Sequence, residues 1–207
     1  KPSAIQVILP DWVPVKLDEA KRFIDGCVKA ADGIGIVLYN PPHAKVVIEG
    51  KDLAQLLLET PGLLGVKCAG GGGDWYKNME AALEHKSVFI PGHHMATGIK
   101  NGASGSYSNM ACLNPKATVE WLQLIHSDLP SAMELEARIN QFMKSAILPF
   151  LDSGYEGLAC DKLMAHVGGW TEINTRLMWP YNSIPEDQSK MVLEKVRMLI
   201  PEFLPRT

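Results

Sequence analysis

Short apolar runs alternate with amphipathic segments through the first half of the chain. Five apolar runs predict buried strands, the last of them weak, at residues 4–10, 33–40, 63–69, 87–92 and 104–113. Between them, apolar positions recur at helical spacing in the segments 16–32, 49–60, 74–86 and 94–102. Strands that are apolar throughout and alternate with helices predict a parallel sheet covered on its faces.

The second half of the chain shows only helical patterns. Helices are expected at Pro115–Ser127, Ser131–Phe150, about Gly157–Val167, and Ser183–Ile200. The β–α repeat fits an open doubly wound sheet, and it also fits a (β/α)8 barrel, which needs eight strands and about 250 residues. If it is a barrel, residues 1–114 form part of it, and residues 115–207 form its last helix and a C-terminal helical extension.

Composition narrows the functional class. The chain has 207 residues, 46% of them hydrophobic, and a net charge of −3, so neither nucleic acid nor a membrane is an expected partner. None of its four cysteines lies in a C-x-x-C spacing, which argues against a structural zinc site. Free thiols in a reducing compartment, the cytoplasm, are expected. The four are Cys27, Cys68, Cys112 and Cys160.

Two polar side chains end consecutive apolar runs. Tyr39 follows "GIGIVL" and Lys67 follows "GLLGV", 28 residues later. Sites in both α/β architectures are built at the carboxyl ends of strands, so the two side chains could meet there. A buried amine favours the neutral, nucleophilic form, and a nearby tyrosine could carry its protons. The alternative is a lysine that reaches out to solvent and a tyrosine that covers the core.

Three further segments are candidates for binding. The glycines Gly70–Gly73 follow Lys67 rather than precede it, which argues against a phosphate loop, and Asp74 is the expected cap of the next helix. His93 and His94 are adjacent on a loop and should diverge, so they are a poor metal pair, but one could touch a substrate. The small residues of "NGASGSYSN", residues 101–109, could surround a carboxylate with N–H donors or simply form a tight turn.

Together these segments resemble the dihydrodipicolinate synthase / N-acetylneuraminate lyase family of Schiff-base (β/α)8 enzymes. "YNPP" at residues 39–42 resembles the family's Tyr-Asn-x-Pro after strand five, and "GVK" at 65–67 resembles its sixth-strand lysine motif. "GHH" and "NGASGSYSN" resemble its seventh-strand glycine and its Gly-x-x-Gly-x-Ile-Ser segment. The resemblance implies strands four to eight of a barrel, and we expect the sequence to be the C-terminal part of a longer chain.

The resemblance also implies roles for these residues. Lys67 would form an imine with pyruvate or a related 2-oxo acid, without any cofactor, and Tyr39 would shuttle protons. The expected substrate-binding residues are Gly92, His93, His94, Gly105, Ser106 and Tyr107. The family's members are commonly homodimers or homotetramers, and the loop around Trp12 is the expected place for a dimer contact.

Departures from the family pattern limit this interpretation. The family's Thr-Thr segment does not occur in these 207 residues, and Ala44 stands at the position of an arginine that binds the second substrate of true dihydrodipicolinate synthases. Trp12 stands at a position where the family usually has a tyrosine. These changes favour another 2-oxo-acid lyase or dehydratase. The alternatives are a catalytically silent family member that binds or regulates, and an open-sheet nucleotide binder.

Overall fold

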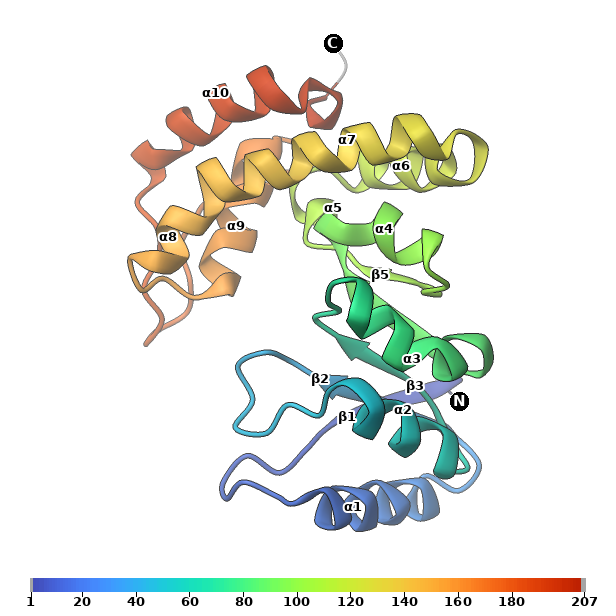
Figure 1. The fold of residues 1–207 in the computed structure, drawn as a ribbon. Coiled ribbons are helices and arrows are strands. Elements are labelled where there is room, and N and C mark those ends of the chain that lie inside the picture. The colour runs from blue at the N-terminus through green and yellow to red at the C-terminus, as the bar shows by residue number, and fades with distance from the viewer. Residues whose placement is uncertain (1, 206–207) are drawn as a thin grey trace. The chain divides into compact units, whose positions relative to one another are not determined.

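The computed structural model describes residues 2–205 and contains one parallel sheet. Its strands follow one another in sequence order, and each is parallel to its neighbour (Figure 1). Doubly wound sheets reverse the strand order, whereas barrel walls do not. The arrangement confirms the predicted β/α alternation and favours a barrel segment. The strands are β1 (Ala4–Ile8), β2 (Gly35–Asn40), β3 (Leu63–Cys68), β4 (Ser87–Pro91) and β5 (Gly105–Tyr107).

Helices cover one face of this sheet. They are α1 (Leu17–Ala30), α2 (Gly50–Glu59), α3 (Gly73–His85) and the short α4 (Met95–Lys100) that follows the 3-10 turn η1 (Gly92–His94). Alternate strand residues such as Leu38 and Val66 are fully buried in a core with Ile24 of α1 and Leu53 of α2. Since successive side chains point to opposite faces, Tyr39 and Lys67 lie on the other face.

The remaining helices form a second compact unit. By internal contacts, one unit is Lys1–Pro91 with Gly98–Tyr107, and the other is Gly92–Thr97 with Ser108–Thr207. The core of the second unit contains Trp121, Phe142 and Phe203. Its helices are α5 (Met110–Leu113), α6 (Pro115–Ser127), α7 (Leu129–Phe142), the π-helix η2 (Met143–Ile147), α8 (Leu148–Asp152), α9 (Gly157–Gly168), η3 (Glu186–Gln188), α10 (Ser189–Leu199) and η4 (Pro201–Phe203).

Three predicted elements have different limits in the structure. The fifth strand ends at Tyr107, and the apolar residues after it form α5. The helix expected from residue 131 to 150 contains the π-turn η2 just before Pro149. Proline has no N–H to continue the α-helical ladder, which accounts for a wider turn at this point. The last helix begins at Ser189, after Pro185 and a 3-10 turn. Within residues 2–205, no helix combines the length and apolarity needed to cross a bilayer.

Candidate active site

The strand pairing of β2 and β3 brings Tyr39 and Lys67 side by side. The two are register partners near the carboxyl ends of their strands. Lys67 Nζ lies over the Tyr39 ring, 4.1 Å from its centroid. Both residues are half-buried. The structure therefore places the predicted nucleophile and proton carrier in contact, while their roles stay predictions.

A second tyrosine also reaches this lysine. Lys67 Nζ is 4.9 Å from the centroid of the Tyr107 ring on β5. The Tyr107 ring meets Phe89 of β4 edge to face, with centroids 5.3 Å apart. Tyr107 was expected to bind substrate, but neither the contact of its ring with Lys67 nor the place of Phe89 beside it was predicted from the sequence. The signal for them was alternation, which puts Phe89 and Tyr107 on the same sheet face as Lys67.

Gly105 and Ser106, the other two expected binding residues on β5, differ in their surroundings. Gly105 is the register partner of Phe89, and a Cβ there would be in ordinary contact with the Phe89 ring. The Ser106 hydroxyl is buried, and within residues 2–205 it has no hydrogen-bond partner. Such an atom carries a desolvation cost of about 1–3 kcal/mol. Because Ser106 lies between Gly105 and Tyr107 in the strand and pairs with the buried Ile90, this hydroxyl points to the face opposite Lys67.

The glycine run after Lys67 forms the turn into α3. Gly70 has a φ of +73°, a left-handed conformation that favours glycine. The cap position of α3 is Gly72, so the expectation that Asp74 caps this helix is wrong. Asp74 instead lies in the first turn, where its charge suits the helix dipole and pairs with Lys77 at 3.6 Å.

The neighbouring thiol of Cys68 is not a second nucleophile. Burial raises its pKa to about 11, and the nearby Glu49 carboxylate adds to the rise, although a hydrogen bond from the Gly70 backbone opposes it. The thiol also faces the Phe89 carbonyl oxygen, 3.9 Å away. A thiol with this pKa stays protonated at neutral pH, so Cys68 is a poor nucleophile there.

The histidine pair lies in the second unit, in the turn η1. Their rings are 4.2 Å apart and inclined by 49°, so the expectation that they diverge is wrong. Burial and, to a smaller extent, the adjacent His94 lower the pKa of His93 to about 4, although a hydrogen bond with Asn109 opposes this shift. His93 is therefore neutral near pH 7 and can offer a hydrogen bond but no positive charge. Among residues 2–205, no cluster of three His, Cys, Asp or Glu residues is placed to hold a metal ion.

Gly92 opens the same turn at a very close backbone approach. A Cβ on Gly92 would overlap the Ser108 hydroxyl and lie 2.7 Å from Ser108 Cα. That hydroxyl is also buried without a hydrogen-bond partner in the described part of the chain. Only glycine fits this approach, which holds the turn against the segment after β5.

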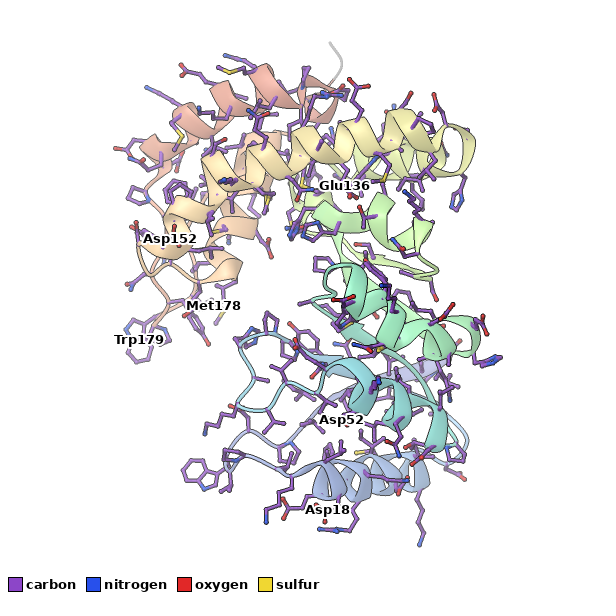
Figure 2. All side chains as sticks on the ribbon, in the orientation of Figure 1. Asp18, Asp52, Glu136, Asp152, Met178 and Trp179 are labelled. Atoms are coloured by element: carbon purple, nitrogen blue, oxygen red, sulfur yellow. The ribbon has the colours of Figure 1, made fainter. Side chains whose placement is uncertain are left out.

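A buried carboxylate on α7 binds the first turn of α4, the helix that follows η1. Glu136 is 4% exposed and accepts hydrogen bonds from the Thr97 N–H, at 3.0 Å, and from the Thr97 hydroxyl. Figure 2 labels the Glu136 side chain. The sequence analysis missed Glu136. Its signal was a charged residue in the apolar stripe of a helix, beside Leu135 and one turn before Ile139, both buried.

Lys45 lies outside the predicted set of catalytic and substrate-binding residues and contacts the loop before α1. Lys45 donates from its ammonium to the Trp12 carbonyl, at 3.0 Å, and from its N–H to Asp11, at 2.9 Å. These hydrogen bonds hold the loop that contains Trp12, a residue that is 92% exposed.

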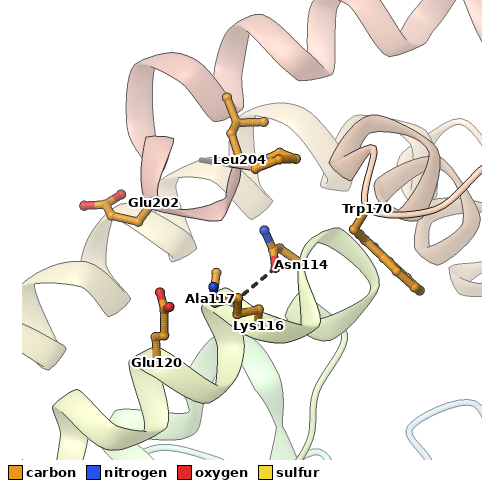
Figure 3. A pocket seen from close by; sticks show the side chains of 8 residues that line it. Asn114, Lys116, Ala117, Glu120, Trp170, Glu202 and Leu204 are labelled. Atoms are coloured by element: carbon orange, nitrogen blue, oxygen red, sulfur yellow. Dashed lines mark hydrogen bonds between the residues drawn. The ribbon is translucent and has the colours of Figure 1, made fainter. Parts of the chain in front are cut away.

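In the second unit, a pocket of about 260 Å³ lies at the start of α6, where Asn114 caps the helix (Figure 3). None of the predicted site residues lines this pocket.

Comparison with known proteins gives structural matches alone, since no protein-family model and no curated protein match the sequence. A prophage protein of the dihydrodipicolinic acid synthase family from E. coli K12, solved with pyruvate, has a TM-score of 0.77 and 17% identity. The match covers 95% of this chain and 66% of that one. A Sulfolobus 2-keto-3-deoxygluconate aldolase in complex with D-KDPG has a TM-score of 0.77 and 14% identity, covering 99% of this chain and 69% of that one.

A third similar structure is the sialic acid aldolase of Ruminococcus gnavus, with a TM-score of 0.74 and 17% identity. The match covers 97% of this chain and 66% of the aldolase, so the chain spans about two thirds of the length of these three proteins. The resemblance that the motifs indicated is thus confirmed in three dimensions. The chain has the fold of five consecutive strands, with the following helices, of a (β/α)8 barrel of the dihydrodipicolinate synthase type.

Proposed function

We propose that this chain belongs to a lyase that acts on pyruvate or a related 2-oxo acid through a Schiff base on Lys67. The observation that carries the proposal is the Lys67 amine in contact with Tyr39 at the carboxyl ends of adjacent strands. The shared fold supports it, because the similar prophage protein was solved with pyruvate and the other two similar structures are aldolases. The reaction needs no cofactor.

In the proposed reaction, the neutral Lys67 amine attacks the keto carbon of the 2-oxo acid. Loss of water from the carbinolamine gives a protonated imine, which accepts electrons when a carbon–carbon bond or a β-hydroxyl is broken. Tyr39 carries the proton to and from the adduct. Gly92 and the backbone of Gly105, Ser106 and Tyr107 help to hold the acid, and His93 or His94 contacts its distal part.

The test is borohydride reduction in the presence of pyruvate, followed by peptide mass mapping of the full-length folded protein. We expect the pyruvate-derived mass on the Lys67 peptide and none in Lys67→Ala. A folded protein that shows no adduct on Lys67 contradicts the proposal.

A silent binding protein of the same fold is the second candidate. The departures at Ala44 and Trp12 favour it, because these positions differ from the residues usual in the family. Saturable binding of a 2-oxo acid by calorimetry, without any reducible adduct, would favour this candidate over the lyase.

We further propose a cytoplasmic homodimer or homotetramer. All four cysteines are free thiols, which fits a reducing compartment. The exposed Trp12, in the loop held by Lys45, is the proposed contact. Light scattering should show an oligomer that Trp12→Ala weakens, and a monomer at all concentrations would contradict this.

A further inference from the structure

The ring of Tyr107 faces the same amine as the ring of Tyr39. Lys67 Nζ lies 4.1 Å from one ring centroid and 4.9 Å from the other, both inside the range of about 6 Å for cation–π contacts. We propose that the Tyr107 side chain is a positioning residue for Lys67, which holds its ammonium and iminium forms from β5. The catalytic meaning of this contact rests on the proposed function, whereas the contact with the amine does not.

The sheet itself sets this arrangement. Lys67 and Phe89 are register partners on β3 and β4, and Phe89 pairs with Gly105 on β5. Tyr107 comes two residues after Gly105 and so points to the same face. Phe89 stands between the two in strand order and fixes the Tyr107 ring edge to face at an angle of 87°.

The residue type at position 107 makes this contact possible. The segment Gly102–Ser108 follows the family spacing Gly-x-x-Gly-x-Ile-Ser, with Tyr107 in place of the isoleucine. An isoleucine has no π face to attract a cation. The Tyr107 ring is 48% exposed, so an aromatic residue here is not required to fill the core. The Tyr107 ring contacts the Lys67 amine and the Phe89 ring.

In the proposed reaction, the Tyr107 ring would attract the cationic forms of the Lys67 nitrogen. When the amine attacks a carbonyl carbon, the C–N bond forms, and the carbinolamine then releases water to leave a cationic iminium. The negative face of an aromatic ring attracts that cation as it attracts the starting ammonium. The Tyr107 ring therefore keeps the nitrogen in place before and after condensation, and its hydroxyl is not needed for this.

Reductive methylation tests the contact without any 2-oxo acid. Formaldehyde and cyanoborohydride are applied to the wild type, Tyr107→Phe and Tyr107→Ile, and the methylation of Lys67 is followed by peptide mass mapping. Lys77, whose side chain is 81% exposed, is the internal reference. This reaction also passes through an iminium on Lys67, so loss of the ring should slow Lys67 methylation about three- to tenfold, and Tyr107→Phe should stay within twofold of wild type. An unchanged Lys67 rate in a folded Tyr107→Ile overturns the inference.

Pyruvate trapping then tests the catalytic part. We expect Tyr107→Ile to raise the pyruvate concentration for half-maximal trapping about three- to tenfold. Tyr107→Phe keeps the ring and should show the wild-type concentration. Tyr155→Leu, which removes a half-buried tyrosine packed on Phe150, is the matched control and should leave both assays unchanged. If Tyr107→Ile does not fold, Tyr107→Met takes its place.

The two assays separate the two possible failures. A wild type that traps no pyruvate but whose Lys67 methylation responds to Tyr107→Ile contradicts the proposed function and leaves the contact standing. Trapping with an unchanged half-maximal concentration in Tyr107→Ile contradicts the positioning role alone.

Discussion

Lys67 Nζ lies over the face of the Tyr39 ring, 4.1 Å from its centroid, with the two residues paired across β2 and β3. The contact is therefore between the amine and the π system. Proton transfer needs the phenol oxygen within about 2.6–3.2 Å of the reacting atom. The ring contact and the proposed proton transfer therefore use different parts of the Tyr39 side chain, the π face for the first and the hydroxyl for the second.

The ring and the hydroxyl of Tyr39 can be separated by substitution. Tyr39→Phe keeps the ring over Lys67 but cannot carry a proton, and we expect turnover to fall about 10²–10⁴-fold. Borohydride trapping at saturating pyruvate should persist in this variant. Tyr39→Leu, which loses the ring as well, should trap more weakly. Turnover in Tyr39→Phe equal to that of wild type would show that another group moves the proton.

Gly92→Ala should destabilise the protein because its Cβ has no room beside Ser108. Overpacking of this kind costs about 1–3 kcal/mol, and the free energy of unfolding in urea measures it. Gly26→Ala is the matched control. Gly26 lies within α1, where a Cβ would meet no atom within 4 Å, so alanine should stabilise the helix by about 0.5–1 kcal/mol. Equal effects of the two substitutions would contradict the close approach at Gly92.

Glu136 should be needed for the stability of the second unit. Its two oxygens accept from the Thr97 N–H and hydroxyl, and glutamine can offer only one acceptor at this buried position. We expect Glu136→Gln to lower the free energy of unfolding by about 1–3 kcal/mol. Glu134→Gln, at an exposed position of the same helix, should change it by less than about 0.5 kcal/mol. A Glu136→Gln variant as stable as Glu134→Gln would show that the hydrogen bonds are dispensable.

The sequence predicted the sheet well where the chain has long apolar runs between turn residues. The strand predicted for β5 was too long, because periodicity alone cannot tell whether a short apolar run such as Met110–Leu113 is a strand or a helix. Tyr39 and Lys67 were predictable as neighbours because a single β–α repeat separates them. The Glu136–Thr97 hydrogen bonds and the Tyr107 ring contact join residues about 40 positions apart. Local pattern carries no information on such tertiary pairs.

The buried His93 should make stability depend on pH in a defined window. Its pKa is about 4 in the folded protein, because of burial and the adjacent His94, against an unfolded value near 6.5. Between these values the unfolded chain binds more protons than the folded one, so stability falls as the pH drops from about 6.5 to 4. Above pH 6.5 both states are neutral at this residue, and it contributes no further change. The loss attributable to His93 is on the order of 1–3 kcal/mol.

Comparison of wild type with His93→Gln isolates this histidine from the carboxylates that titrate in the same range. Glutamine stays neutral and can still bond with Asn109, so the two unfolding free energies should follow parallel curves above pH 6.5. Below it, the wild type should lose stability more steeply than the variant. His126→Gln, at an exposed position of α6, is the control and should follow the wild type throughout. Parallel curves for wild type and His93→Gln down to pH 4 would contradict the lowered pKa, and would leave His93 free to act as a cation towards a substrate.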